Sequence, residues 1–251
     1  MRTTRQLREV WAPACNVPLT SRTLVPGVRV QVHARTIEAV QALGSVFQAH
    51  RYHVRQGDTG AYNCRRITGG TGFSLHAYGI AIDVNWNSNP FRERLVTDMP
   101  PEMIQDVYRI RTFQDLPVWR WGGDWDKNPA TEHTSYDAMH FEVVASPQEL
   151  ASGIAWSTVA QPPRDRARPD TWPTLHPGDR GPTVVTLQQL LSLPADGVFG
   201  NGTAAAVRAY QQSHGLTADG IVGLASWTAL LTGQPPVGPD VPSPVKLPVQ
   251  P

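Results

Sequence analysis

Two side chains in one short stretch of this 251-residue chain have the chemistry of a metal site or of a buried acid–base pair. His76 and Asp83 are seven positions apart, and the residues between them are mostly small or apolar, which predicts a buried turn and strand. Burying an imidazole and a carboxylate is costly unless they pair with each other or bind a metal. Two interpretations therefore stand: a core histidine hydrogen-bonded to an aspartate, or a metal site with a third ligand elsewhere.

The candidate for that third ligand is His140. It lies in a stretch, Met139 to Val144, that alternates in polarity and predicts a strand with His140 and Glu142 on one face. Two imidazoles and one carboxylate form a donor set that Zn2+ accepts, with water in the fourth position. The metal interpretation thus predicts zinc held by His76, Asp83 and His140.

Hydrolysis at such a site also needs an acid–base group and a positive group for the substrate. Asp137, three residues before His140, is predicted to take a proton from water and later to protonate the leaving amine. Glu142 is the next candidate for this base. An arginine would anchor a substrate carboxylate, and the candidates upstream of His76 are Arg55, Arg65 and Arg66.

The elements around these residues follow from hydrophobic periodicity. Residues 28–33 alternate as a half-buried strand, and Thr36 is expected to cap a helix with an apolar stripe that extends to Phe47. A polar loop, residues 51–72, leads into the stretch that contains His76. A second helix is expected after Pro101. Together these elements would place the candidate ligands in one domain, residues 1–159.

Composition narrows the function classes. The chain is 17% charged and 40% hydrophobic, with a formal net charge of +1, so a packed core is expected and a nucleic-acid partner is not. The first twenty residues have no continuous apolar segment of a signal peptide, and no run is long enough to insert into a membrane. Cys15 and Cys64 are either bridged, tying the N-terminal segment to the core, or free and buried.

The composition changes near residue 160. A proline-rich, polar linker is expected over 160–174, a helical module over 175–233 and a disordered proline-rich tail over 234–251. Within the module, Ala195-Asp196-Gly197 recurs as Ala218-Asp219-Gly220, and Thr203 and Ser226 follow at matching offsets. Each copy predicts a turn, a cap and a helix. With an earlier amphipathic helix around Leu187, the module should be a bundle of about three helices.

Three motifs together resemble a family of zinc peptidases. They are Ser-x-His-x-x-Gly-x-Ala-x-Asp at residues 74–83, Trp-Gly-Gly-Asp-Trp at 121–125 and Asp-x-x-His-Phe-Glu at 137–142. They resemble those of D-alanyl-D-alanine carboxypeptidases, vancomycin-resistance D,D-dipeptidases and phage L-alanyl-D-glutamate endopeptidases, over roughly residues 28–144. The resemblance implies an α+β, hedgehog-like domain with a small antiparallel sheet. It also implies zinc on His76, Asp83 and His140, with Asp137 as the catalytic acid and base.

The substrate-binding arginine departs from the family pattern. The family often has an arginine directly after a tyrosine upstream of the zinc motif, whereas Tyr52 is followed by His53 here. Arg55 is therefore our choice for this catalytic role.

The C-terminal module resembles the all-α, three-helix peptidoglycan-binding domain. Its marks are Gly178-Asp179-Arg180-Gly181-Pro182, Leu187-Gln188, the Asp-Gly turn at 196–200 and Ala209-Tyr210-Gln211. This resemblance implies peptidoglycan as the partner.

The function expected from both resemblances is a monomeric, zinc-dependent hydrolase that cuts a peptide bond of the peptidoglycan stem. A phage endolysin, made in the cytoplasm and released to the cell wall by a holin, fits a chain without a signal peptide. The alternatives are a bacterial D-Ala-D-Ala carboxypeptidase and a non-catalytic, zinc-containing wall-binding protein, because the hedgehog signalling domain holds zinc on a similar fold.

Overall fold

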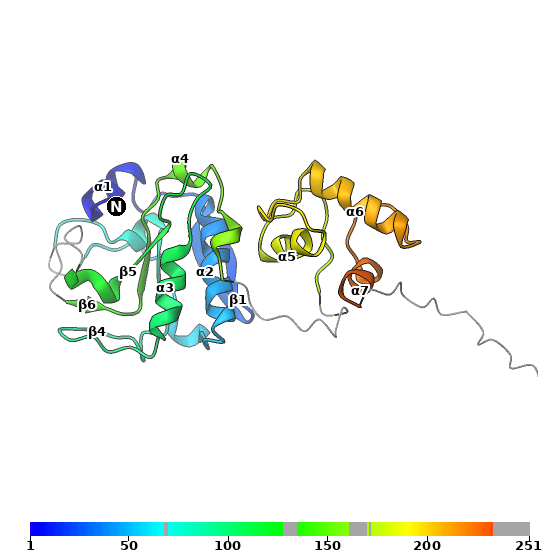
Figure 1. Cartoon of the computed structure of the whole chain (residues 1–251). Coiled ribbons are helices and arrows are strands. Elements are labelled where there is room, and N and C mark those ends of the chain that lie inside the picture. The colour runs from blue at the N-terminus through cyan, green and yellow to red at the C-terminus, as the bar shows by residue number, and fades with distance from the viewer. Residues whose placement is uncertain (68–69, 128–134, 161–169, 171, 233–251) are drawn as a thin grey trace, which may run out of the picture. The chain divides into compact units, whose positions relative to one another are not determined.

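A computed structural model describes residues 1–67, 70–127, 135–160, 170 and 172–232. The chain divides into two compact units, Met1–Pro163 and Arg164–Pro251 (Figure 1). Residues 161–169 of the expected linker and the whole expected tail, 234–251, lie outside the described residues. No helix in the described ranges has the length and apolar character needed to cross a bilayer.

The first unit mixes helices with small antiparallel sheets, as the sequence predicted. Its helices are α1 (Thr4–Val10), α2 (Ile37–Ala49), α3 (Pro101–Arg109) and α4 (Pro147–Leu150). Its strands are β1 (Leu19–Val25), β2 (Val28–His33), β3 (Ala81–Asp83), β4 (Phe91–Arg92), β5 (Trp119–Trp121), β6 (Tyr136–Asp137) and β7 (His140–Val143). Short 3-10 turns are η1 (Ala34–Thr36), η2 (Gln56–Asp58), η3 (Leu75–Tyr78), η4 (Gly122–Lys127) and η5 (Trp156–Thr158).

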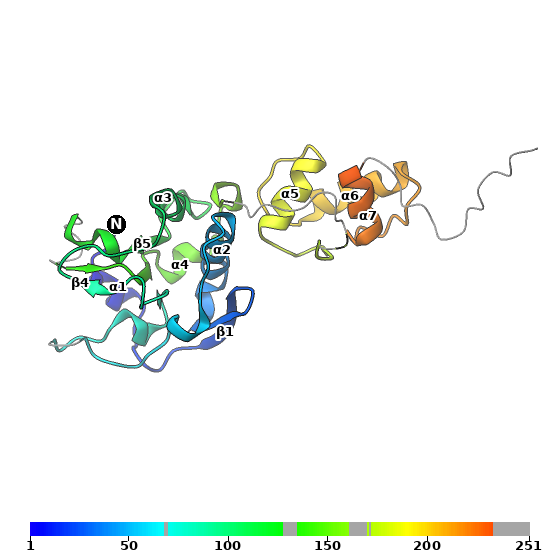
Figure 2. The ribbon, with the colours of Figure 1, turned by 90° about the horizontal axis from the view of Figure 1, so that it is seen from below.

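The central sheet has the strand order β3–β7–β5, and β1 pairs with β2 and β4 with β6. The apolar residues of β3, β7 and β5 are almost wholly buried, and α2 packs against both β1 and α3 (Figures 1 and 2). The alternation expected over Val28–His33 is observed in β2. Thr36 occupies the position before α2, but its hydroxyl donates to the carbonyl of His33 instead of capping the helix.

Helix α1 and strand β1 were not predicted from the sequence. A capping box formed by Thr3 and Gln6 begins α1. The segment before this helix is held by Arg2, whose guanidinium contacts both oxygens of Glu149 and the carbonyl of Val144. These contacts join residues more than 140 positions apart, which sequence periodicity does not reveal.

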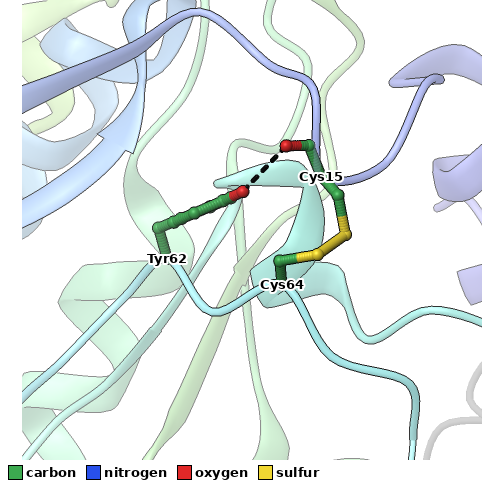
Figure 3. The surroundings of a disulfide bond; sticks show 3 residues. All are labelled: Cys15, Tyr62 and Cys64. Carbon is green, nitrogen blue, oxygen red and sulfur yellow. Dashed lines mark hydrogen bonds between the residues drawn. A yellow bond between two sulfur atoms is a disulfide. The ribbon is translucent and has the colours of Figure 1, made fainter.

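A disulfide joins Cys15 to Cys64, which resolves the two alternatives for these cysteines (Figure 3). The Tyr62 hydroxyl donates to the carbonyl of Cys15, and the Cys15 N–H donates to the carbonyl of Ala77. The N-terminal segment is thus attached both to the loop before His76 and to the turn that contains it.

The second unit contains α5 (Pro182–Leu190), α6 (Asn201–Ser213) and α7 (Leu224–Thr232), as expected for a three-helix module. Its core includes Trp172, Leu187, Phe199 and Trp227.

The 23-residue repeat of this unit marks two equivalent buried networks. The Gln188 side-chain amide donates to Asp196 and Thr203, and the Gln211 amide donates in the same way to Asp219 and Ser226. The expectation that Thr203 caps a helix is wrong, because Gly200 precedes α6. The Thr203 hydroxyl instead accepts a hydrogen bond from the Gln188 amide. Each glutamine also accepts from the glycine N–H of its Asp-Gly turn. The repeat therefore attaches each turn to the preceding helix.

Replacing Cys15 and Cys64 together with serine should lower the free energy of unfolding of the first unit. A cross-link that closes 49 positions is expected to contribute about 4 kcal/mol through the entropy of the unfolded chain. Denaturant titration of the oxidised parent, the reduced parent and the double variant checks this. The reduced parent and the variant should match, and equal midpoints for all three proteins would contradict the prediction.

Candidate metal centre

His76 lies in the short turn η3, which begins after the Ser74 hydroxyl and ends at Gly79. The Ser74 hydroxyl accepts from the His76 N–H, and Gly79 ends the turn with φ +67°. A Cβ at Gly79 would lie 2.7 Å from the His33 nitrogen, so this position requires glycine for space as well as for conformation. The turn then leads directly into β3, which ends at Asp83.

The register of β3 and β7 brings the other two predicted ligands together. Asp83 lies directly opposite His140 in the antiparallel pair. The Asp83 Oδ1 atom is 3.0 Å from His140 Nδ1 and 3.2 Å from His76 Nε2. His76 Nε2 and His140 Nδ1 are also 3.2 Å apart, so three donor atoms form a near-equilateral triangle.

This donor set fits a zinc ion. Tetrahedral zinc with bonds of about 2.0 Å places its ligand atoms about 3.3 Å apart, close to the observed separations. The Nδ1 of His76 lies 2.6 Å from the carbonyl of Ala61, which only accepts, so this nitrogen carries the proton and Nε2 presents a lone pair. Both histidines are buried, and the Asp83 side chain is 20% exposed.

The charges around the triangle also favour a cation. Burial opposes ionisation of Asp83, yet hydrogen bonds from His140 and His76 hold the pKa of its carboxyl well below the usual range. Burial likewise opposes protonation of His140, but Asp83 and Glu142 raise its pKa to about 10. The site thus favours positive charge. A divalent cation bound by the three side chains would provide that charge in place of the proton on His140.

Asp137 lies in the same cavity as the triangle. The cavity has a volume of about 480 Å³, and its lining includes Trp125 and Phe91 beside the charged groups. Asp137 belongs to β6, where it pairs with Phe91 of β4. Its Oδ1 is buried and has no hydrogen-bond partner among the described residues.

The environment of Asp137 suits proton transfer near neutral pH. Burial is the main cause that raises the pKa of its carboxyl to about 6; His140 and His76 oppose this rise, and Asp83 adds to it. A cation bound at the triangle would lower that pKa, because it stabilises the carboxylate. The sequence placed Asp137 near the metal without coordinating it, and the structure places it in the cavity and outside the triangle.

Arg55, predicted to anchor the substrate, does not line this cavity. Its guanidinium pairs with Asp58 and donates to the Ser88 hydroxyl, and its backbone N–H donates to the Asn85 side chain. Asp58 is 3% exposed, and the contacts of Arg55 join this turn to the loop after β3. The acidic partner of this guanidinium is thus the aspartate three residues along the chain, and the substrate-binding role of Arg55 stays a prediction from the sequence.

The arginines that do line the cavity are Arg8 and Arg65. Arg65 directly follows the disulfide-bonded Cys64. Arg8 lies on α1, and its Nε donates to the carbonyl of Phe73. Sequence reasoning considered Arg65 but missed Arg8, because α1 was not predicted.

The tryptophan-glycine motif positions the cavity wall. The Trp121 indole donates to the carbonyl of Ala138, which holds β5 against the segment between Asp137 and His140. A Cβ at Gly122 would lie 2.4 Å from the Asp137 carbonyl oxygen and 3.1 Å from the His140 Cβ. Only glycine leaves room for both residues here. The Trp125 ring then packs edge-on against the His140 ring, at 5.2 Å between centroids.

Comparison with known proteins assigns both units. Residues 68–143 match the D-alanyl-D-alanine carboxypeptidase family, and residues 180–230 match the peptidoglycan binding domain family.

Two solved structures share shorter stretches with the chain. An endolysin of Burkholderia phage AP3 is 41% identical over 26% of this chain and 27% of its own, with a TM-score of 0.26. A peptidoglycan-binding protein from Clostridioides difficile, solved with glutamine hydroxamate, is 35% identical over 23% of this chain and 40% of its own, with a TM-score of 0.23. The chain therefore spans less than half of either relative.

The two family matches and the mixed fold agree with the resemblances found in the motifs. The chain combines a domain of the D-alanyl-D-alanine carboxypeptidase family with a C-terminal peptidoglycan-binding domain.

Proposed function

We propose that this protein is a zinc-dependent peptidoglycan hydrolase that cuts a peptide bond of the stem peptide. The observation that carries the proposal is the shared cavity of three metal-binding side chains and one separate buried carboxylate, Asp137. A structural metal site has no need of an additional acid in an open cavity, whereas hydrolysis needs a proton acceptor beside the metal. The two family matches support the substrate class.

The residues have separable roles in this proposal. When bound by His76, Asp83 and His140, zinc supplies Lewis acidity and lowers the pKa of water. Asp137 takes a proton from the attacking water and returns it to the leaving amine. One side chain therefore acts first as the base and then as the acid. Trp125 and Phe91 line the same cavity and supply apolar surface beside this carboxylate.

A positive group is still needed for the anionic substrate, and Arg65 takes this role in place of Arg55. The stem peptide carries free carboxylates, and a guanidinium binds a carboxylate through paired hydrogen bonds. Arg65 lines the cavity that contains the triangle, so its side chain lies where a substrate carboxylate would bind.

The C-terminal domain is proposed to hold the enzyme on the wall. Such tethering raises the local concentration of stem peptide without altering the catalytic cavity. Action in host lysis and release through a holin stay predictions from the sequence.

Replacing His76 with alanine should abolish tight zinc binding, since it removes one of three ligands. The parent should hold one zinc per chain by elemental analysis, and added zinc should raise its unfolding temperature. The matched control is His50→Ala, because His50 also pairs with a carboxylate, Asp106, but lies outside the triangle. Stoichiometric zinc in the His76→Ala protein would refute the ligand assignment.

Asp137→Asn should separate chemistry from metal binding. Asparagine keeps the size and one oxygen but accepts no proton at neutral pH, so kcat should fall by about a hundredfold to ten-thousandfold. Zinc content and fold should equal those of the parent. Mass spectrometry of digested peptidoglycan follows the reaction and identifies the bond. Parent-like turnover by a zinc-loaded variant would place the base elsewhere.

Arg65→Ala should raise KM for a soluble stem peptide by about tenfold to a hundredfold, the loss expected for a charge-assisted hydrogen bond. Arg55→Ala is the matched control. It should lower the free energy of unfolding, because Asp58 loses its partner, and leave KM near the parent value. The opposite pattern, with KM changed only in Arg55→Ala, would restore the sequence-based choice.

A further inference from the structure

A buried ion pair lies beside the candidate metal centre. Arg120 of β5 and Glu142 of β7 face each other across the central sheet, and each side chain is 2% exposed. The Arg120 Nε donates to Glu142 Oε1. Removing both charges from water is costly, and well-packed apolar residues would often serve stability equally well. The pair therefore calls for a reason beyond stability.

Glu142 has a second contact, with a predicted metal ligand. Its Oε2 lies 3.5 Å from His140 Nε2, while the other ring nitrogen, Nδ1, faces Asp83 and His76. A carboxylate facing Nε2 favours the tautomer that carries its proton there. That tautomer leaves the Nδ1 lone pair directed into the triangle. The two oxygens of Glu142 thus join Arg120 on one side to His140 on the other.

The remaining donors of Arg120 reach the N-terminal arm, which we define as residues 2–4. Its Nη1 donates to the carbonyl of Arg2 at 3.0 Å, and Nη2 contacts the Thr4 hydroxyl at 3.5 Å. The arm is anchored in turn by the pair between Arg2 and Glu149. These contacts fix the plane of the guanidinium. The guanidinium in turn fixes the orientation of the Glu142 carboxylate, whose second oxygen faces His140. The arm lies outside the segment that matches the carboxypeptidase family, residues 68–143.

We propose that Glu142 is a positioning residue that holds His140 in the tautomer that binds metal through Nδ1, and that Arg120 and the N-terminal arm hold Glu142 in place. This inference rests on the proposed zinc site. It assigns Glu142 a role other than the alternative base considered from the sequence, because both of its oxygens are already engaged.

Glu142→Gln tests the proposal with a nearly isosteric change. The glutamate has two oxygens that only accept, one bonded to Arg120 and one facing His140, whereas a glutamine has one acceptor and one donor group. If its oxygen faces Arg120, its NH2 faces His140 Nε2 and favours the other tautomer, which protonates Nδ1. The zinc Kd, measured by competition with a chelating dye, should therefore rise by about tenfold to a hundredfold.

The matched control is Asp106→Asn. Asp106 bridges a histidine and an arginine in the same way, with His50 Nε2 at 2.8 Å and Arg109 Nη1 at 2.6 Å, but it takes no part in the triangle. Its zinc Kd should equal that of the parent. If Glu142 were merely structural, both variants would unfold at lower denaturant concentration and both would keep the parental zinc Kd, which would overturn the proposal.

A direct measurement on the parent does not depend on how the variant folds. Long-range 1H–15N spectra of the zinc-loaded, full-length protein report which ring nitrogen of each histidine carries the proton. His140 should be protonated at Nε2, and His76 at Nδ1, which faces the Ala61 carbonyl. Protonation of His140 at Nδ1 would overturn the proposal while leaving the proposed hydrolase intact. A parent that binds no zinc would overturn both.

Discussion

The antiparallel register between β3 and β7 is the constraint on which the candidate site depends. It sets Asp83 opposite His140, and a slip of one residue would turn one of the two side chains to the other face of the sheet. The strands are short, so neighbouring contacts must preserve the register. Gly79 lets the turn that bears His76 pass close to His33, and the Trp121 indole holds β5 beside the segment that leads into β7.

Charge balance then determines what the site accepts. Three carboxylates, those of Asp83, Asp137 and Glu142, line one cavity. Among the described residues, Glu142 alone of the three pairs with a buried arginine, and Asp83 and Asp137 lie close to two imidazoles. A bound cation would balance negative charge here, and the carboxylate left outside the triangle keeps the freedom to exchange a proton. In the proposed function, metal binding and proton transfer therefore fall to different side chains of similar type.

The sequence predicted those parts of the fold that depend on local pattern. Alternation predicted β2 and β7, helical spacing predicted α2 and the 23-residue repeat predicted the C-terminal helices. It also predicted that His76, Asp83 and His140 lie together, which they do; that they hold zinc stays a prediction. Contacts between residues far apart in the chain were not predicted from the sequence. Helix α1 carries no strong pattern, and its place beside the cavity depends on contacts with residues far along the chain, such as that between Arg8 and Phe73. The pairing of Arg55 with Asp58 was also not predicted, and the substrate-binding role of Arg55 stays a prediction.

The N-terminal contacts also define what part of this protein can be exchanged as a unit. A fragment cut at the borders of the family match, residues 68–143, would lack α2, both cysteines of the disulfide and the arm that contacts Arg120. It would expose the buried face of α3 and the interior of the central sheet, against which α2 packs. A chimaera that carries this domain to another C-terminal module therefore needs the chain from Arg2 through the turn η5, Trp156–Thr158. The segment that matches the family thus contains most of the residues that line the cavity. The unit that would have to be exchanged, Met1–Pro163, is about twice as long as this segment.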